Sequence, residues 1–533
     1  MVSVIRPSMR FMTNASQILG QNTRRIAGIL TSRSRASLFP LHASLSTLKR
    51  HFGTNEATLH KPSTDYDLYV VRSQSWQKDP LQESWQLSDL DYTMPPVFLK
   101  TMLVYPIEKP SMRSVFLGRM LTSLSATLDH YRMLNAVFRK EHGELKLIRT
   151  KVAAIPFIVH HSMPVSGFSS LAKLKNAGFP PNDLKLHETL KGKSNYPPGI
   201  PRMKATLENR PLAKFQATWI EGGVILTYGF HHVGVDGAAM CAFIDQWASN
   251  AMHLAHKKKI PLRTSLHDES DRGRLMGKRT STENRVDSLS TRPSTPNLSV
   301  QAKSMQPVVI HFHKDGIRRI KQAASSEHDK TSTYDAICAL IWKCVTAARL
   351  KVYKPAHDET TILAQTVDLR SRFNPPLSPL FQGNATIGVL TEPILVTDAV
   401  AAGSLPRLSS LVRAAHSGVT EAKVLDLISR VATLKDKTSA GLAAKTLQRF
   451  DMALTDMRHA SHYTADFGFG APCAVRNVYR PGLPGTIRAV PSATDGVAAD
   501  ELALEVEMPI DLDCLEHFVT DSELLQYADI VCA

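Results

Sequence analysis

The order of apolar and polar positions predicts a chain of mixed helices and strands. Long segments with apolar residues at a spacing of three and four predict amphipathic helices at residues 114–134, 238–256 and 332–350, and a closing helix is expected at 511–528. Ser332 or Thr333 is a suitable N-cap for the third helix. Shorter apolar runs predict strands within residues 65–76, 98–107, 144–150, 214–230, 307–313, 360–373, 385–396, 470–479 and 501–509. Glu221-Gly222-Gly223 divides the run at 214–230 into two strands joined by a hairpin turn.

The pattern of apolar and polar positions that predicts helices and strands is missing from two segments, one at the N-terminus and one in the middle of the chain. Residues 257–305 are polar, rich in Ser, Thr and Arg, and without periodicity, which predicts a linker or a long surface crossover. We therefore expect an α/β protein with two halves, 64–256 and 306–533, preceded by a basic leader at 1–63. The sequence shows no internal repeat of solenoid period.

Composition changes this picture in two respects. The formal net charge of the 533 residues is +16, but the first 55 residues hold eight Lys and Arg and no acidic residue, so the leader accounts for nearly half of the excess. Such a segment is typical of a mitochondrial transit peptide, and a disordered basic leader is the alternative. The rest of the excess lies largely in the crossover, and no nucleic-acid motif accompanies it, so a nucleic-acid partner is not expected. No run of 18 apolar residues predicts a membrane span.

Six scattered cysteines form no metal-binding spacing and favour a reducing compartment. Other familiar chemistry is also missing. The sequence contains no G-x-S-x-G nucleophile elbow, no phosphate-binding P-loop and no H-E-x-x-H zinc motif. Gly468 to Cys473 begin like a dinucleotide-binding loop but lack its third glycine. What remains is a histidine-dependent reaction without a metal or a redox cofactor.

The stretch GFHHVGVDGAAM at residues 229–240 carries the candidate chemistry. His232 and Asp236 have an H-x3-D spacing that occurs five times in the chain, so the spacing alone decides nothing. Only at this position does it lie between an apolar strand and an amphipathic helix, with a doubled histidine and a glycine after the aspartate. An imidazole there could remove a proton from a hydroxyl or an amine at neutral pH. The alternative is a pair of ordinary histidines, with Asp236 as the N-cap of the next helix.

At this point the sequence resembles a known family. HHVGVDG resembles the HHxxxDG signature of CoA-dependent acyltransferases, and TADFGFGAP at 464–472 resembles the DFGWG motif of the BAHD acyltransferases, with Phe469 in place of Trp. Three further stretches agree, namely WQLSDLDYTMPP, STYDAICALIWKCVTAAR and VDLRSRFNPPLSPLFQGN. The resemblance covers about residues 84–533. It is to the fungal secondary-metabolite branch, of the trichothecene 3-O-acetyltransferase type.

The resemblance implies a fold and a set of roles. The fold would be two similar chloramphenicol-acetyltransferase-like domains joined by a long crossover, with an active-site channel between them. His232 would be the general base, and Asp236 would be an orienting residue paired with an arginine, either Arg370 or Arg372. Asp466 would be part of a structural loop, although the family often counts it as catalytic. His231 is expected to support the turn, and His231 and Gly237 are candidates for substrate contact.

The activity implied by the resemblance is transfer of an acyl group, acetyl in the first instance, from acyl-CoA to a hydroxyl or amine of a secondary metabolite. Acyl-CoA would be a co-substrate, and neither a bound cofactor nor a metal is expected. Two alternatives stay open: a condensation-type acyltransferase that takes its acyl group from a carrier protein, and an inactive relative that binds a ligand. We expect a monomer in the cytoplasm, with the mitochondrion as the alternative.

Overall fold

The fold is given by a computed structural model, which describes residues 57–62, 66–141, 144–161, 169–184, 211–261, 269–278, 305–326, 331–440, 447, 449–477, 485–490 and 503–533. All of these residues belong to one compact unit. The basic leader that composition predicts, with its possible transit peptide, lies outside the described residues up to residue 56. The described chain then begins with a strand inside the predicted leader, so the folded part starts before Tyr66.

The described residues form a first sheet of seven strands. Their spatial order is β1 (Ala57–Pro62), β2 (Tyr66–Val71), β7 (Ile155–His160), β8 (Ala213–Ile220), β9 (Gly223–His231), β4 (Phe98–Pro106) and β16 (Ala474–Asn477). Neighbouring strands are antiparallel except β7 and β8, which are parallel. The predicted hairpin between β8 and β9 is present, and Gly222 at its tip has a φ of +80°. That left-handed conformation favours glycine.

A second sheet of seven strands comes almost entirely from the later half of the described residues. Its spatial order is β13 (Thr386–Leu390), β12 (Leu363–Asp368), β15 (Met452–Met457), β17 (Gly485–Val490), β18 (Ala503–Asp511), β10 (Met305–Phe312) and β19 (Asp529–Cys532). Strand β15 runs parallel to both β12 and β17. Two smaller sheets accompany it, β3-β6-β5 (Gln82–Gln86, Glu144–Thr150, Val137–Glu141) and β11-β14 (Thr360–Thr361, Ile394–Leu395). This mixture confirms the predicted α/β class.

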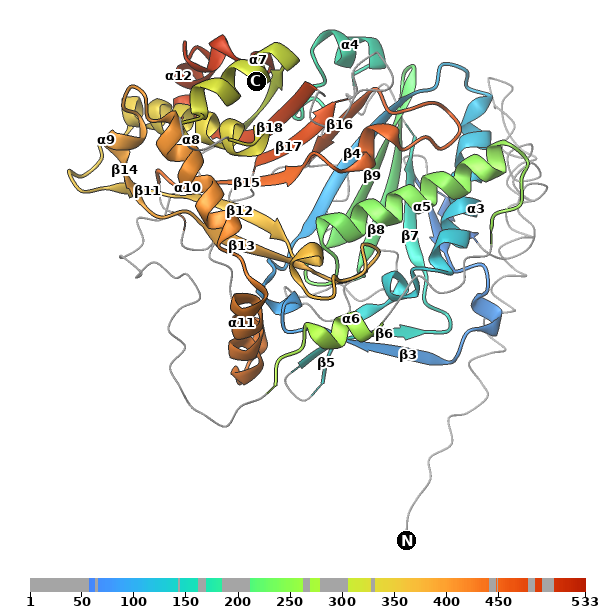
Figure 1. Cartoon of the computed structure of the whole chain (residues 1–533). Coiled ribbons are helices and arrows are strands. Elements are labelled where there is room, and N and C mark those ends of the chain that lie inside the picture. Colours follow the sequence, from blue (N-terminus) through green and yellow to red (C-terminus); the bar gives the residue numbers. More distant parts are fainter. Residues whose placement is uncertain are drawn as a thin grey trace. The chain divides into compact units, whose positions relative to one another are not determined.

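Helices cover the sheets (Figure 1). Helices α3 (Met112–Leu128) and α5 (Gly237–Ala255) lie side by side against the first sheet. Helices α7 (Lys314–Ala324), α8 (Thr333–Val352) and α10 (Leu405–Ser417) pack together against the second. The other α-helices among the described residues are α4 (Leu171–Asn176), α6 (Glu269–Arg274), α9 (Val396–Ala399), α11 (Glu421–Thr433) and α12 (Leu515–Val519). Ser332 is the N-cap of α8, and its side chain and that of Asp335 form a reciprocal capping box.

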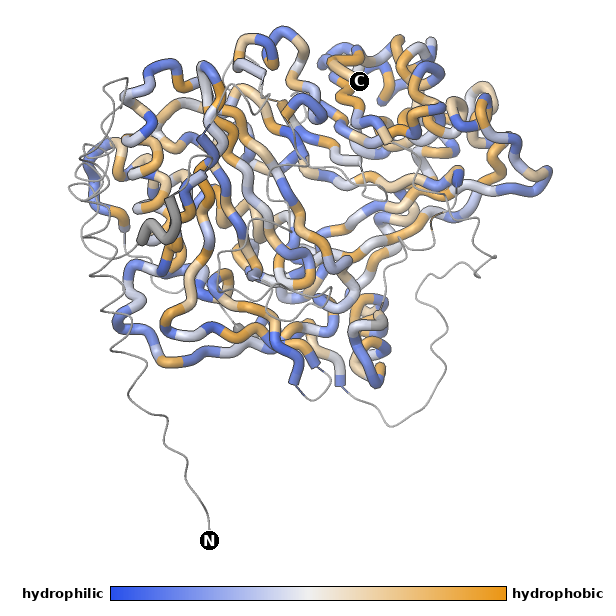
Figure 2. Tube along the Cα trace, turned by 180° about the vertical axis from the view of Figure 1, so that it is seen from behind, coloured by the Kyte–Doolittle hydropathy of each residue, from blue (hydrophilic) through white to orange (hydrophobic). Residues whose placement is uncertain are grey.

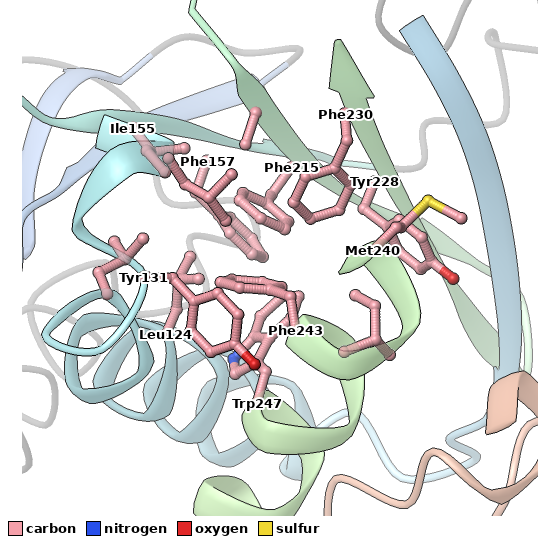
Figure 3. Close-up of a cluster of buried hydrophobic side chains, with 14 of the residues drawn as sticks. Leu124, Tyr131, Ile155, Phe157, Phe215, Tyr228, Phe230, Met240, Phe243 and Trp247 are labelled. Carbon is pink, nitrogen blue, oxygen red and sulfur yellow. The ribbon is translucent and has the colours of Figure 1, made fainter. Parts of the chain in front are cut away.

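Buried aromatic rings fill the space between the first sheet and its helices. Phe215 and Phe230 project from β8 and β9 toward Phe243 and Trp247 of α5 (Figure 3). The rings meet mostly edge to face, an arrangement that stabilises aromatic pairs beyond the area they bury. This packing holds α5 firmly on the sheet, so the turn that joins β9 to α5 has two rigid supports.

Hydrophilic and hydrophobic residues are interspersed along the Cα trace (Figure 2). Consistent with this, no helix among the described residues is long and apolar enough to cross a bilayer.

Three elements differ from the sequence-based expectation. The predicted crossover contains helix α6, although its sequence has no apolar periodicity. The predicted closing helix is broken after Val519, because the Asp521 carboxylate accepts hydrogen bonds from the backbone N–H groups of Glu523 and Leu524 and so competes with the helix. Strand β16 comes from the later half of the chain but pairs with β4 at the edge of the first sheet.

Candidate active site

The histidine pair lies on the turn between β9 and α5. His231 is the last residue of β9, and its carbonyl accepts hydrogen bonds from the backbone N–H groups of Gly234 and Val235 at 2.9 and 3.2 Å. The N–H of His232 donates to the carbonyl of Val97 at 2.9 Å, which ties the turn to the segment before β4. The strand, the helix and this third segment therefore fix the backbone that carries His232.

The two histidines point to different surroundings. His231 is fully buried, and its ring lies 5.1 Å from that of Phe98 and 4.8 Å from that of Phe138, centroid to centroid. It does not line the neighbouring cavity, whereas His232 does. This placement favours the supporting role for His231, the first of the two roles that the sequence suggests.

A cavity of about 1450 Å³ opens beside His232. Residues of both large sheets line it, together with one face of α5. Besides Gly237 and Met240, α5 contributes Ala238, Cys241, Ala242, Asp245, Gln246 and Ser249. At a rise of about 1.5 Å per residue, these positions extend the wall roughly 16 Å along the helix. A cavity of this size has room for two small substrates or for one large substrate in extended form.

Gly237, the first residue of α5, also lines the cavity. A Cβ atom there would lie 3.1 Å from the sulfur of Met457. The absence of a side chain thus keeps the cavity open beside the histidine turn.

The surroundings of His232 favour the neutral imidazole. Burial lowers its pKa below the ordinary histidine value, because the charged form loses solvation, and the nearby Asp236 opposes this shift only in part. The Nδ1 atom is buried and has no well-formed hydrogen bond to the described residues.

Asp236 is fully buried and joins two elements. Its Oδ1 accepts a hydrogen bond from the N–H of Ala239 at 2.8 Å, so it is the N-cap of α5. Its two oxygens also accept bonds from the two Nη atoms of Arg370, at 2.9 and 3.0 Å. Burial alone would raise the pKa of this carboxyl, but Arg370 and the donated hydrogen bonds hold it below its ordinary value. The carboxylate faces the guanidinium rather than the cavity.

Arg370 is thus the arginine that pairs with Asp236. Its Nη2 also donates to the carbonyl of Phe381 at 2.9 Å. Arg372, the other candidate, donates instead to the carbonyl of Val419 and contacts His416. Asp236 is therefore both the N-cap of α5 and the partner of an arginine, as the two sequence-based interpretations predict.

Asp466 lies in a different place. Its Oδ1 accepts hydrogen bonds from the N–H groups of Gly468, Phe469 and Gly470 at 2.6 to 3.0 Å, all within its own loop. Asp466 is not among the residues that line the cavity. The loop is held on α3, because Arg119 stacks on the ring of Phe469 and donates to the carbonyl of Gly468.

The same loop shows why the H-x3-D spacing of His462 and Asp466 is accidental. His462 is buried, with its Nε2 atom 3.6 Å from the sulfur of Cys241, and burial beside Arg488 lowers its pKa to about 3. Asp466 meanwhile bonds its own backbone. The two residues of this pair do not act on each other.

Comparison with known proteins gives the family. The model of the Transferase family matches residues 70–524 of this chain. The chain belongs to the BAHD transferase family. It is accordingly an acyltransferase.

Two fungal acyltransferases are similar to this BAHD protein over nearly their whole length. Acetyltransferase FGR3 of Gibberella zeae is 24% identical over 477 residues, which cover 86% of this chain and 93% of that protein. Acyltransferase easC of Emericella nidulans is 23% identical over 478 residues, which cover 84% and 96%.

Solved structures show the same fold. TRI101 of F. graminearum, crystallised with coenzyme A and deoxynivalenol, matches with a TM-score of 0.65 and 17% identity over 84% of this chain and 100% of that one. Vinorine synthase matches with a TM-score of 0.55 and 16% identity over 84% and 94%. At these identities the likeness concerns the fold alone.

Three residues beside the BAHD signature were not predicted from the sequence. Asn384 donates from its side-chain Nδ2 to the carbonyl of His232 at 2.8 Å. Ala385 and Thr386 donate to Asp236 at 2.8 and 3.2 Å. Asn384 is the last residue of a stretch that carries the family resemblance, and Ala385 and Thr386 follow it, but no periodicity or spacing marks them as neighbours of the histidine turn.

The described part of the chain contains no cluster of three or more His, Cys, Asp or Glu side chains that could hold a metal ion.

Proposed function

We propose that the protein transfers an acyl group from acyl-CoA to a hydroxyl group of a small acceptor, with His232 as the general base. The observation that carries this proposal is the placement of His232: its ring lines a large cavity, burial lowers its pKa, and its backbone is fixed from three sides. A base that is neutral and held in one orientation contributes roughly 100- to 10,000-fold to such a reaction.

The proposed reaction needs no other protein nucleophile. Nε2 of His232 accepts the proton of the acceptor hydroxyl as the oxygen attacks the thioester carbonyl carbon. The tetrahedral oxyanion collapses, the carbon–sulfur bond breaks, and the CoA thiolate leaves. The imidazolium of His232 then returns the proton to this thiolate. No covalent acyl-enzyme forms, and no metal or bound cofactor enters the balance.

The other predicted site residues take supporting roles in this proposal. Asp236 orients the turn through Arg370, and His231 supports it from the apolar side. Gly237 leaves room for substrate beside the base. Asp466 keeps its loop in shape, which its three backbone partners support.

Acetyl-CoA is the donor we propose first, because the similar FGR3 is named an acetyltransferase and TRI101 was crystallised with coenzyme A. For the acceptor we propose a hydroxylated secondary metabolite, since TRI101 was crystallised with deoxynivalenol and with T-2 mycotoxin. An amine acceptor is the alternative: a rice relative, 27% identical over 58% of this chain, is named putrescine hydroxycinnamoyltransferase.

We also propose that the halves 64–256 and 306–533 act as two domains around the cavity, and that the protein is a cytoplasmic monomer. The leader at 1–63 keeps the mitochondrion as the alternative compartment. Light scattering after gel filtration measures the mass, and a C-terminal fluorescent fusion reports the compartment.

The deciding experiment measures the release of free CoA thiol from acetyl-CoA with a panel of hydroxylated terpenoids and polyketides, deoxynivalenol among them. Wild type and His232→Ala are compared, and both are checked for folding. Acceptor-dependent release by wild type that drops at least 100-fold in the variant supports the proposal. Release that the substitution leaves unchanged removes His232 as the base.

Two further measurements address the alternatives. Turnover with an acyl carrier protein as donor, and none with free acetyl-CoA, would indicate a condensation-type enzyme. Calorimetric binding of both acetyl-CoA and a hydroxylated acceptor, without turnover of that bound pair, would indicate a ligand-binding relative. In both cases the proposed reaction is wrong.

A further inference from the structure

A buried chain of polar groups connects helix α6 of the crossover to the backbone of His232. Arg272 of α6 forms an ion pair with Asp91, Nη1 to Oδ2 at 3.2 Å. Asp91 Oδ1 accepts hydrogen bonds from the side-chain Nδ2 and the backbone N–H of Asn384, at 2.7 and 3.1 Å. Asn384 Nδ2 also donates to the carbonyl of His232 at 2.8 Å. Three segments far apart in the sequence thus meet at the catalytic turn.

The three residues that make these contacts are buried. Asp91 and Asn384 have no exposed surface, and Arg272 is 6% exposed. Burial raises the pKa of Asp91, but Arg272, Asn384 and the N–H of Ser88 all donate to the carboxyl group. Because each neighbouring group is a donor, the carboxylate form satisfies them all. Removing Arg272 leaves the buried Asp91 carboxylate without its ion-pair partner. Removing the Asn384 amide takes a donor from the carbonyl of His232, which water does not readily replace at a buried site.

The amide of Asn384 is well suited to bridge. Its two N–H bonds are directed at two different acceptors, Asp91 Oδ1 and the His232 carbonyl. The next residue, Ala385, donates its N–H to Asp236 at the other end of the turn. The segment Asn384–Thr386 therefore holds the turn at both ends, and the position of this segment sets the position of His232.

Arg272 in turn fixes this segment. A Cβ atom at Gly383 would lie 3.2 Å from Nη2 of Arg272 and 2.6 Å from the ring of Phe381. The guanidinium also lies over the Phe381 ring, 5.4 Å from its centroid. The backbone before Asn384 thus approaches the arginine as closely as glycine permits, and the crossover is part of the support of the site.

We propose that Arg272, Asp91 and Asn384 form a positioning relay through which the crossover helix α6 holds the general base His232 in its reactive orientation. This inference deepens the proposed function and rests on it for the role of His232. The three are positioning residues: they act on the backbone of His232, and none touches the reacting atoms. A displacement of about 1 Å at a reacting group can cost roughly 100-fold in rate.

The test uses the full-length chain and a readout that needs no turnover. Hydrogen exchange followed by mass spectrometry is measured for peptides that span residues 231–236 in wild type, Asn384→Ala and Arg272→Ala. We expect exchange in this turn to rise at least tenfold in both variants. Arg272→Lys, which keeps the charge beside Asp91, restores most of the protection.

Two matched controls remove similar groups elsewhere. Asn250→Ala removes a buried amide of α5 that bonds Thr127, and Arg349→Ala removes an arginine paired with Asp511. Neither residue lines the cavity. Both should leave exchange at 231–236 unchanged. If Arg272→Ala does not fold, Asn384→Ala and Arg272→Lys still decide the question.

Kinetics with acetyl-CoA and an active acceptor complete the test. A relay predicts a 10- to 100-fold lower kcat in Asn384→Ala with the KM for acetyl-CoA within twofold of wild type. Unchanged exchange at 231–236 in Asn384→Ala overturns the relay, as does a wild-type kcat. If His232→Ala keeps full activity, the proposed function falls, whereas the exchange data still show whether the relay holds the turn.

Discussion

His232 and His231 are neighbours in sequence, yet they differ in every property that matters for chemistry. Alternation along β9 turns His231 into the aromatic core, and the tight turn then directs His232 to the cavity. The consequence is a histidine that stays neutral at lower pH than an exposed one, because burial lowers its pKa.

This environment predicts the pH dependence of turnover. As the proposed base, His232 must be neutral to accept a proton, so kcat/KM should rise with pH through its pKa and level off above it. Because that pKa is lowered, the midpoint of the rise should lie below the pKa of about 6.5 that is usual for histidine. A pH–rate profile from pH 4.5 to 8 measures it. A midpoint above 6.5 would contradict the assigned environment.

His462 predicts a pH effect on stability. Burial beside Arg488 lowers its pKa to about 3 in the folded protein, whereas the unfolded chain takes up the proton near the ordinary value of 6.5. Between these values the unfolded state binds more protons, so stability falls as pH falls, by up to about 1.4 kcal/mol per pH unit. In His462→Gln this contribution is absent. Urea unfolding between pH 4.5 and 7 should give a flatter slope for the variant, and equal slopes would refute the assignment.

A site residue can be predicted from the sequence when the pattern that marks it lies in one short stretch. His232, Asp236 and Gly237 stand in one short stretch between an apolar strand and an apolar helix, so their context marks them. The sequence offers Arg370 and Arg372 as partners of Asp236, and only the contacts in the structure distinguish between them. Asp91 and Asn384 lie in two stretches that carry the family resemblance, but nothing local shows that they meet, because their contact joins segments about 290 residues apart.

At the scale of elements, the Asp236–Arg370 pair joins the start of α5 to the turn that follows β12. Removing one partner leaves a buried charge, which typically costs about 3–5 kcal/mol. We therefore expect Asp236→Ala and Arg370→Ala each to destabilise strongly, and the double variant to lose much less than the sum of both. A double-mutant cycle by urea unfolding measures the coupling. Additive losses would show that the pair is not a unit.

The Asp466 loop is an element for which we propose a structural role. Three backbone N–H groups depend on one carboxylate oxygen, and Gly468 has a φ of +84°, with Arg119 occupying the space that a Cβ would need. Asp466→Ala should lower stability by about 1–3 kcal/mol. Turnover per folded molecule should stay within twofold of wild type. A loss of kcat above 100-fold in a folded variant would instead place Asp466 in the chemistry.

The predictions of helices and strand pairing failed where an element is determined by long-range contacts rather than by its local sequence pattern. Helix α6 shows no apolar periodicity, because the side chains described as buried in it are those of Asp271 and Arg272. Strand β16 was predicted as a strand, but no local signal could show that it pairs with β4, more than 360 residues earlier. Non-local pairing is invisible to periodicity, whereas the β8–β9 hairpin is visible because its turn is local.

At the scale of the described molecule, the two large sheets are interlocked through β16. This strand extends the first sheet, while Arg476 within it donates to Glu505 of β18 in the second sheet at 3.0 Å. Arg476 also donates to the carbonyls of Phe179 and Gly178. The ion pair between Arg476 and Glu505 joins the sheets, and both of its side chains are buried. The two halves should therefore unfold together rather than one after the other.

Calorimetry of the full chain tests this coupling. We expect one transition for wild type, with the calorimetric and van't Hoff enthalpies equal apart from any contribution of the leader. Arg476→Met keeps much of the side-chain volume but leaves Glu505 without its ion-pair partner, so it should lower the Tm by several degrees and broaden or split the transition. Arg413→Met, which removes the half-exposed partner of Asp335, is the control and should leave a single transition. Two separate transitions in wild type would mean that β16 does not couple the halves, and that each half folds on its own.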